Sequence, residues 1–230
     1  MNRVLPSSAL CVVIILTAGW GLLPGPPMIC DRVECGDVAN LPSDKPGKGE
    51  AEKILASLPS FLKESTSILA HMEALRRAAI VLQGHADAEM KLLAALACRA
   101  LNTEASGRSD AAAWFDLAFF IGCQNQIGRH DDDGVIDTEE GVRGFGYMKK
   151  ALALAPDSGE MQYGAALMMH PAMRSRDHAM PANPGLGKDV YDQHLRKAAS
   201  MAGQGSLLEK NLRAHITRWG GNYDAVKRAG

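Results

Sequence analysis

The chain has 230 residues, of which 47% are apolar and 22% are charged, a balance that excludes an intrinsically disordered chain. Its 25 basic and 26 acidic residues almost cancel, and no basic patch stands out, which argues against a nucleic-acid partner. Aromatic residues make up only 5% of the chain while Ala, Leu and Met are frequent, so the composition predicts helices and few strands.

Residues 1–23 are predicted to be a targeting segment that takes no part in the fold. Arg3 places a positive charge ahead of an apolar run over 9–16, and small residues follow over 17–19. This is the pattern of a secretory signal peptide. The run is shorter than the roughly 20 apolar residues of a bilayer span, and an uncleaved N-terminal anchor is the alternative. We therefore expect a periplasmic or secreted protein that touches a membrane only if this segment is retained.

A linker is expected over residues 24–50, because prolines and glycines are dense there. Beyond it, apolar residues recur at spacings of three and four, which is the helical period. Gly84 and Gly107 fall where helices should end, because glycine readily adopts the left-handed conformation that closes a helix. The sequence thus predicts an all-α domain over residues 51–230.

Four cysteines follow the targeting segment, and an oxidising compartment permits two disulfides among them. Cys30 and Cys35 lie close together in the linker and are suited to a small local loop. Cys98 and Cys123 fall on two neighbouring predicted helices. In an antiparallel hairpin these two would be offset by about 13 Å along the helices, whereas a disulfide needs Cα atoms within about 7 Å of each other. We predict that both are buried free thiols.

Internal repeats are the most informative feature of the sequence. Four segments share a bulky residue, a small alanine step and a break, and three of the four also carry a basic pair. The segments begin at Ala74, Ala113, Tyr147 and His194. Their equivalent alanines are Ala78, Ala118, Ala151 and Ala198. The alanines are separated by 40, 33 and 47 residues, which indicates helical hairpins joined by loops of variable length.

These segments resemble tetratricopeptide-type repeats, and more closely the Sel-like variant of them. The resemblance is carried by Arg76–Ala79 with Gly84–Glu89, by Trp114 and Phe115 with Ala118 and Gly122, and by Ala151 and Leu152 with Pro156, Tyr163 and Gly164. It covers about residues 70–217. It implies a short α-solenoid of stacked helical hairpins, whose concave face binds a peptide or another protein. The implied role is a protein–protein interaction scaffold or adaptor of the cell envelope.

An enzymatic alternative follows from the same resemblance. Some cysteine-rich Sel-like proteins are hydrolases of cell-wall-like substrates, and these carry a regular cysteine pair in each repeat. Cys98 and Cys123 do not follow that rule. The sequence also lacks a Gly-x-Ser-x-Gly elbow, a phosphate-binding loop and a His-Glu-x-x-His zinc pair. We therefore predict no catalytic residues and no bound cofactor.

The loop over residues 129–140 has the spacing of an EF-hand calcium loop when Gly134 takes its sixth position. The candidate ligands are then Asp131, Asp133, Asp137 and Glu140. Arg129 occupies the first ligand position, where a cation opposes calcium. The alternative is a solvated acidic turn ahead of a helix that starts near Thr138, where acidic side chains suit the positive helix end. A calcium-dependent binding protein is thus an alternative function, with millimolar affinity at most.

A second metal hypothesis concerns methionine and histidine near the middle of the chain. The residues are Met168, Met169, His170, Met173, His178 and Met180. Thioether and imidazole groups are ligands for Cu(I). The alternative is that the first two end an apolar helix and the others lie in a proline-rich loop.

Overall fold

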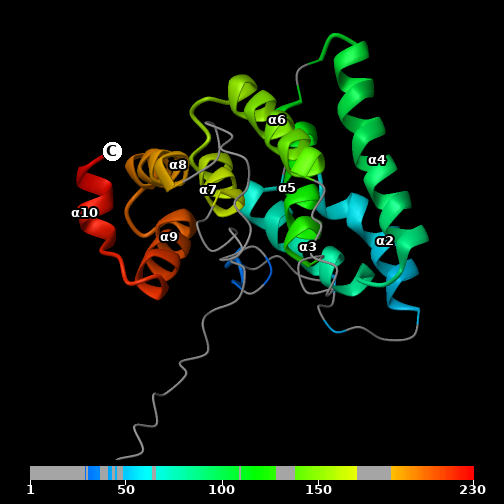
Figure 1. The fold of residues 1–230 in the computed structure, drawn as a ribbon, viewed down its shortest axis with the longest axis horizontal. Coiled ribbons are helices and arrows are strands. Elements are labelled where there is room, and N and C mark those ends of the chain that lie inside the picture. Colours follow the sequence, from blue (N-terminus) through cyan, green and yellow to red (C-terminus); the bar gives the residue numbers. More distant parts are fainter. Residues whose placement is uncertain are drawn as a thin grey trace, which may run out of the picture.

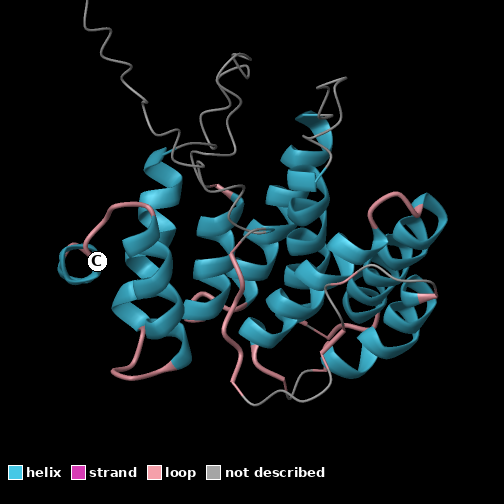
Figure 2. Cartoon of the chain, turned by 90° about the horizontal axis from the view of Figure 1, so that it is seen from below, coloured by secondary structure: helices cyan, strands magenta, loops and turns pink. Residues whose placement is uncertain are grey.

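The computed structural model describes residues 29, 31–36, 41–42, 45, 49–63, 66–108, 110–127, 138–169 and 188–230, with backbone only for 138–142. Within these residues every regular element is a helix, so the predicted all-α class is confirmed (Figure 2). The helices are α2 (Glu50–Phe61), α3 (Ile68–Leu82), α4 (Ala86–Ala105), α5 (Ala111–Ile127), α6 (Thr138–Leu154), α7 (Gly159–Met168), α8 (Lys188–Met201), α9 (Leu207–Arg218) and α10 (Tyr223–Arg228) (Figure 1).

The predicted targeting segment, residues 1–23, lies outside the described residues, so export and location stay predictions. In the part of the chain that the structure describes, none of the helices combines the length and the apolar character needed to cross a membrane.

Local signals set the helix ends. Ser67, Ser158 and Ser206 cap α3, α7 and α9, and each side-chain oxygen accepts a hydrogen bond from a backbone N–H in the first turn. Gly84 and Gly107 follow α3 and α4 with φ values of 79° and 70°. The helix stops predicted at these two glycines are confirmed, because only glycine adopts this left-handed backbone without a steric cost.

Helix α5 is the centre of the fold and is buried on every side. Its aromatic residues Trp114, Phe115, Phe119 and Phe120 all belong to the hydrophobic core. It packs most extensively on α6 and also contacts α3, α4 and α7, while α7 pairs with α8 (Figure 1). Trp114 and Phe115 are thus core residues, as the apolar pattern around them predicts.

Small residues lie where the helices approach most closely. The four equivalent alanines of the repeat pattern are fully buried: Ala78, Ala118, Ala151 and Ala198. At the crossing of α5 and α7, a Cβ on Gly164 would come within 2.6 Å of the Phe115 ring. Any larger residue at this position would therefore separate the two helices.

The cysteine predictions are partly wrong. Cys123 on α5 is a buried free thiol, as expected, and burial raises its pKa. Cys98 is also free but is exposed. The reason is that α4 lies at the edge of the helical array and buries only the face of Leu92 and Leu96, opposite Cys98. Cys30 lies outside the described residues, so its local loop with Cys35 stays a prediction.

Candidate functional site

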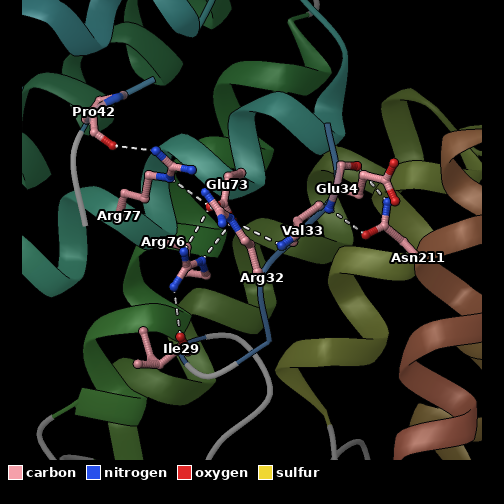
Figure 3. Close-up of polar contacts among 9 residues, drawn as sticks. All are labelled: Ile29, Arg32, Val33, Glu34, Pro42, Glu73, Arg76, Arg77 and Asn211. Carbon is pink, nitrogen blue, oxygen red and sulfur yellow. Dashed lines mark hydrogen bonds and ion pairs between the residues drawn. The ribbon is translucent and has the colours of Figure 1, made fainter. Parts of the chain in front are cut away.

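Residues 31–36 form a segment, which we call the strap, that lies on the helices without helical or strand hydrogen bonding and is bound by side chains of both α3 and α9 (Figure 3). Asp31 and Val33 are buried, and Cys35 is half-buried, whereas Arg32 and Glu34 between them are exposed. Alternation with a period of two is the signature of extended backbone with one side against a surface. The strap therefore lies on the helices as an extended peptide.

Backbone groups of the strap are bound by two side chains from different helices. The N–H of Val33 donates to Oε2 of Glu73 on α3 at 3.0 Å. The N–H of Glu34 donates to Oδ1 of Asn211 on α9 at 2.8 Å, and Nδ2 of Asn211 donates back to the Glu34 carbonyl at 2.7 Å. The Asn211 carboxamide thus pairs with one residue of the strap as a neighbouring strand would in a sheet. These contacts involve no side chain of the strap.

The orientation of Asn211 is fixed from its own helix. Its Nδ2 also donates to the Leu207 carbonyl at 2.9 Å, so both amide hydrogens point at carbonyl oxygens and Oδ1 is left to accept. Asn211 itself is only 5% exposed. A buried carboxamide that is held in one orientation by hydrogen bonds is a rigid binding group for the N–H and C=O of a peptide backbone.

Glu73 is the centre of a buried ion cluster on α3. Its carboxylate accepts from Arg76 at 2.8 Å through both Nε and Nη2, and from Arg77 Nε at 2.7 Å. Burial alone would raise the pKa of Glu73, but the two guanidinium groups and the Val33 N–H outweigh it and hold this pKa below its ordinary value. Glu73 is therefore ionised near pH 7 and accepts from the strap as a carboxylate.

The two arginines of this cluster extend the binding to both sides of the strap. Arg76 Nη1 donates to the Ile29 carbonyl at 3.0 Å, and Arg77 Nη1 donates to the Pro42 carbonyl at 3.0 Å (Figure 3). Each guanidinium thus binds Glu73 with one edge and a backbone carbonyl with another. Arg76 and Arg77 form the basic pair of the first repeat, which here binds backbone outside the repeats.

Side-chain recognition is concentrated at Asp31. Its carboxylate forms an ion pair with Arg218 on α9, and Nδ1 of His215 lies 3.4 Å from its other oxygen. Burial lowers the pKa of His215 to about 4, so the ring is neutral near pH 7. Because Nδ1 faces a carboxylate it carries the proton, and Nε2 accepts from the Tyr191 hydroxyl at 3.0 Å. The surface thus presents one cation and one N–H donor to an acidic side chain.

A second buried polar network joins α3 to α5. Nε2 of His71 lies 3.1 Å from the Lys63 carbonyl oxygen and Nδ1 lies 2.8 Å from Asp116, whose other oxygen accepts from Arg99 at 2.7 Å. Burial lowers the pKa of His71, but the hydrogen bond and the charge of Asp116 outweigh it, and the pKa is raised. His71 and Asp116 are both fully buried, so this pair stabilises helix packing, and only Arg99 at the edge of the network is partly exposed.

The predicted metal residues contribute little to the described structure. Asp131, Asp133 and Asp137 lie outside the described residues, and Glu140 is described only as backbone of α6. Met168 is buried in the core at the end of α7, and Met169 is half-buried behind it. The other copper candidates, His170, Met173, His178 and Met180, also lie outside the described residues. Among the side chains that the structure does describe, no group of three His, Cys, Asp or Glu could hold a metal ion.

Sequence reasoning missed the residues that bind the strap. One signal was present: Arg76 falls on the apolar face of α3, where a charge needs a buried partner, and Glu73 is three residues before it. Asn211, His215 and Arg218 gave no such signal, because each is ordinary on an amphipathic helix.

The chain was compared with protein-family models, with curated proteins and with solved structures, and none of the three comparisons gives a match.

Proposed function

We propose that the chain is a protein–protein interaction scaffold that binds an extended peptide segment of a partner on one face of its helical array. The face is the one that the strap covers, and we call it the strap-binding surface. Its residues are Glu73, Arg76 and Arg77 on α3 with Asn211, His215 and Arg218 on α9. The observation that carries the proposal is that this surface binds peptide backbone through Glu73 and Asn211. Backbone groups are common to all peptides, so the same contacts are open to another chain.

The proposal includes a short α-solenoid of tetratricopeptide or Sel-like type. Its support comes from the repeat pattern in the sequence, from the burial of all four repeat alanines and from the packing of successive helices such as α5 with α6 and α7 with α8. In an array of this kind each hairpin buries its apolar face against its neighbours, and one face stays open along the array.

The proposed place of action is the cell envelope. Its support is the sequence pattern of residues 1–23, which is that of a secretory signal. A fusion of residues 1–40 to a reporter that is active only outside the cytoplasm is expected to give signal, and a stable but silent fusion would contradict export.

The test of the proposed function is partner capture by full-length chains that differ at one asparagine. Asn211→Ala removes the carboxamide that binds peptide backbone. Asn102→Ala is the matched control, because Asn102 is exposed on α4 away from the strap. A partner is expected to be retained by the native chain and by Asn102→Ala, and weakened about tenfold by Asn211→Ala, the loss expected for about 1.4 kcal/mol of hydrogen bonding.

Mapping of the retained partner completes this test. Overlapping peptides from the partner are expected to place binding in a short segment without helical propensity, because Asn211 and Glu73 pair with extended backbone. Retention that is indifferent to Asn211→Ala in a chain with native helical content would contradict the proposal, as would a binding segment that is an amphipathic helix.

A further inference from the structure

We infer that the strap is a ligand of this surface held in cis, and that a partner segment with the same side-chain pattern takes its place. The pattern is an acidic residue, a small aliphatic residue two positions later and a small residue two positions after that, as in Asp31, Val33 and Cys35. This inference rests on the proposed function and adds to it the class of peptide and the means of control.

The helices beneath the strap also contact one another directly, although Val33 of the strap packs into their hydrophobic core. Helix α7 lies between α3 and α9 and contacts both of them. The outward side of the strap is largely exposed: the Arg32 side chain is 71% exposed, although its Nε lies 3.7 Å from Oε1 of Glu73 in an ion pair. The strap is therefore an addition to a surface that the helices already form.

Apart from Arg218, whose ion pair is with Asp31, the binding residues beneath the strap also keep partners on the helices. Glu73 remains bonded to Arg76 and Arg77 on the same helix. Asn211 remains bonded to the Leu207 carbonyl, and Nε2 of His215 remains bonded to Tyr191. A surface whose side chains are fixed in this way is preorganised, and it keeps its geometry when one peptide leaves and another arrives.

The inward residues of the strap define what the surface accepts. Arg218 and His215 require an acidic side chain at the position of Asp31. Val33 is 3% exposed, so its position accepts a side chain of that size and no polar group. At Gly36 a Cβ would come within 3.2 Å of Leu207 and the backbone is left-handed with φ of 71°, so glycine is preferred where the segment leaves the surface.

A covalently attached ligand competes at high effective concentration, so a free peptide binds weakly until the strap is released. The probe is a fluorescent peptide with the sequence of residues 29–36, carrying Cys30→Ser and Cys35→Ser, and its anisotropy is measured with the full chain. In the released chain, Asp31→Ala removes the ion pair to Arg218, and Glu34→Pro removes the N–H that donates to Asn211. The released chain is expected to bind the peptide at least about tenfold more tightly than the native chain does.

Two controls define the site. Asn211→Ala in the released chain is expected to weaken peptide binding about tenfold, and Asp31→Asn in the peptide is also expected to weaken it. The single variant Asp31→Ala leaves the strap backbone contacts in place, and its affinity for the peptide is expected to lie between those of the native and the released chains. It also serves as the released chain if the double variant loses its native circular dichroism.

Three results would overturn the inference. One is a released chain of native helical content that does not bind the peptide, and another is equal binding by native and released chains. The third is a released chain that forms dimers by light scattering through Asn211, which would make a second copy the occupant. If a partner were still captured through Asn211 alongside any of these results, the proposed peptide-binding function would be supported, and only the control of binding by the strap would be contradicted.

Discussion

Glu73 and Asn211 bind the strap from opposite sides, but different interactions hold the two side chains in place. Glu73 is a buried carboxylate whose charge is compensated by Arg76 and Arg77. Asn211 is neutral and is held by one hydrogen bond within α9. The loss of Glu73 therefore leaves buried positive charge, whereas the loss of Asn211 leaves the backbone N–H and C=O of Glu34, an exposed residue, without this partner.

This difference gives a stability prediction for Glu73→Ala. The substitution leaves Arg76, which is 4% exposed, without its carboxylate, and we expect the free energy of unfolding to fall by about 3–5 kcal/mol. Urea unfolding measures it, with Glu52→Ala as the control because Glu52 is exposed on α2 and should change stability by less than about 0.5 kcal/mol. Equal midpoints for the two variants would show that the cluster is not buried in solution.

A pH prediction follows from His71. Its pKa in the folded chain is raised by Asp116, so the stability it adds is fully present below the ordinary histidine pKa of about 6.5 and is lost as pH rises through the folded value. The difference in urea midpoint between the native chain and His71→Gln should therefore shrink between pH 6 and pH 9. A difference that stays constant over this range would mean that His71 is neutral throughout.

For the residues that bind the strap, the sequence held a signal only where a charged residue interrupts an apolar helix face. Arg76 on an apolar face indicates a buried ion pair, and Glu73 is at the right spacing to supply it. The contact of Asn211 with Glu34 joins residues 177 apart in the chain, and no local pattern encodes a pairing of that kind.

Helices were more predictable than individual contacts, because each carries its own period and end signals. Apolar spacing and the glycines at 84 and 107 predicted α3 and α4, and the acidic residues near Thr138, which suit the positive end of a helix, predicted the start of α6. Burial of a given face was less predictable. Cys98 lies in an apolar stripe of α4, yet no neighbouring helix in the described structure covers that face, since α4 lies at the edge.

The repeat alanines test the packing of the helices. Ala151 on α6 is fully buried, and Ala151→Leu should overpack the site and lower the free energy of unfolding by about 1–3 kcal/mol. Ala95→Leu on the exposed face of α4 is the matched control and should leave the melting temperature unchanged. A native melting temperature for Ala151→Leu would show that α6 does not pack closely at this position.

The acidic loop before α6 is predicted not to bind calcium at micromolar concentration. Arg129 takes the first ligand position, and EF-hand affinity depends on the number of charged ligands and on the rigidity of the site. Isothermal titration of the full chain should detect no interaction stronger than millimolar. A saturable micromolar site that disappears in Glu140→Gln would establish calcium as part of the function.

For the whole molecule, composition and repeat pattern were enough to predict an all-α fold, and the part of the chain that the structure describes confirms it. The same pattern led to the hypothesis of a peptide-binding array. Because the comparisons with known proteins gave no match, this hypothesis stays a proposal. What the sequence did not indicate is that residues 31–36 of the predicted linker pack on the helices. The strap is bound by Glu73 on α3 and by Asn211 on α9, two helices far apart in the sequence, and its binding therefore depends on the assembled fold.

Hydrogen–deuterium exchange of the native chain tests the central claim most directly, because the Val33 and Glu34 amides are bonded to Glu73 and Asn211. Both amides should be protected in the free chain. At saturating concentrations of the peptide used as a probe above, they should exchange freely while α3 and α9 stay protected, since the peptide then occupies the strap-binding surface. Strap protection that is unchanged at saturation would contradict the claim that this surface is a site for extended peptides of other chains.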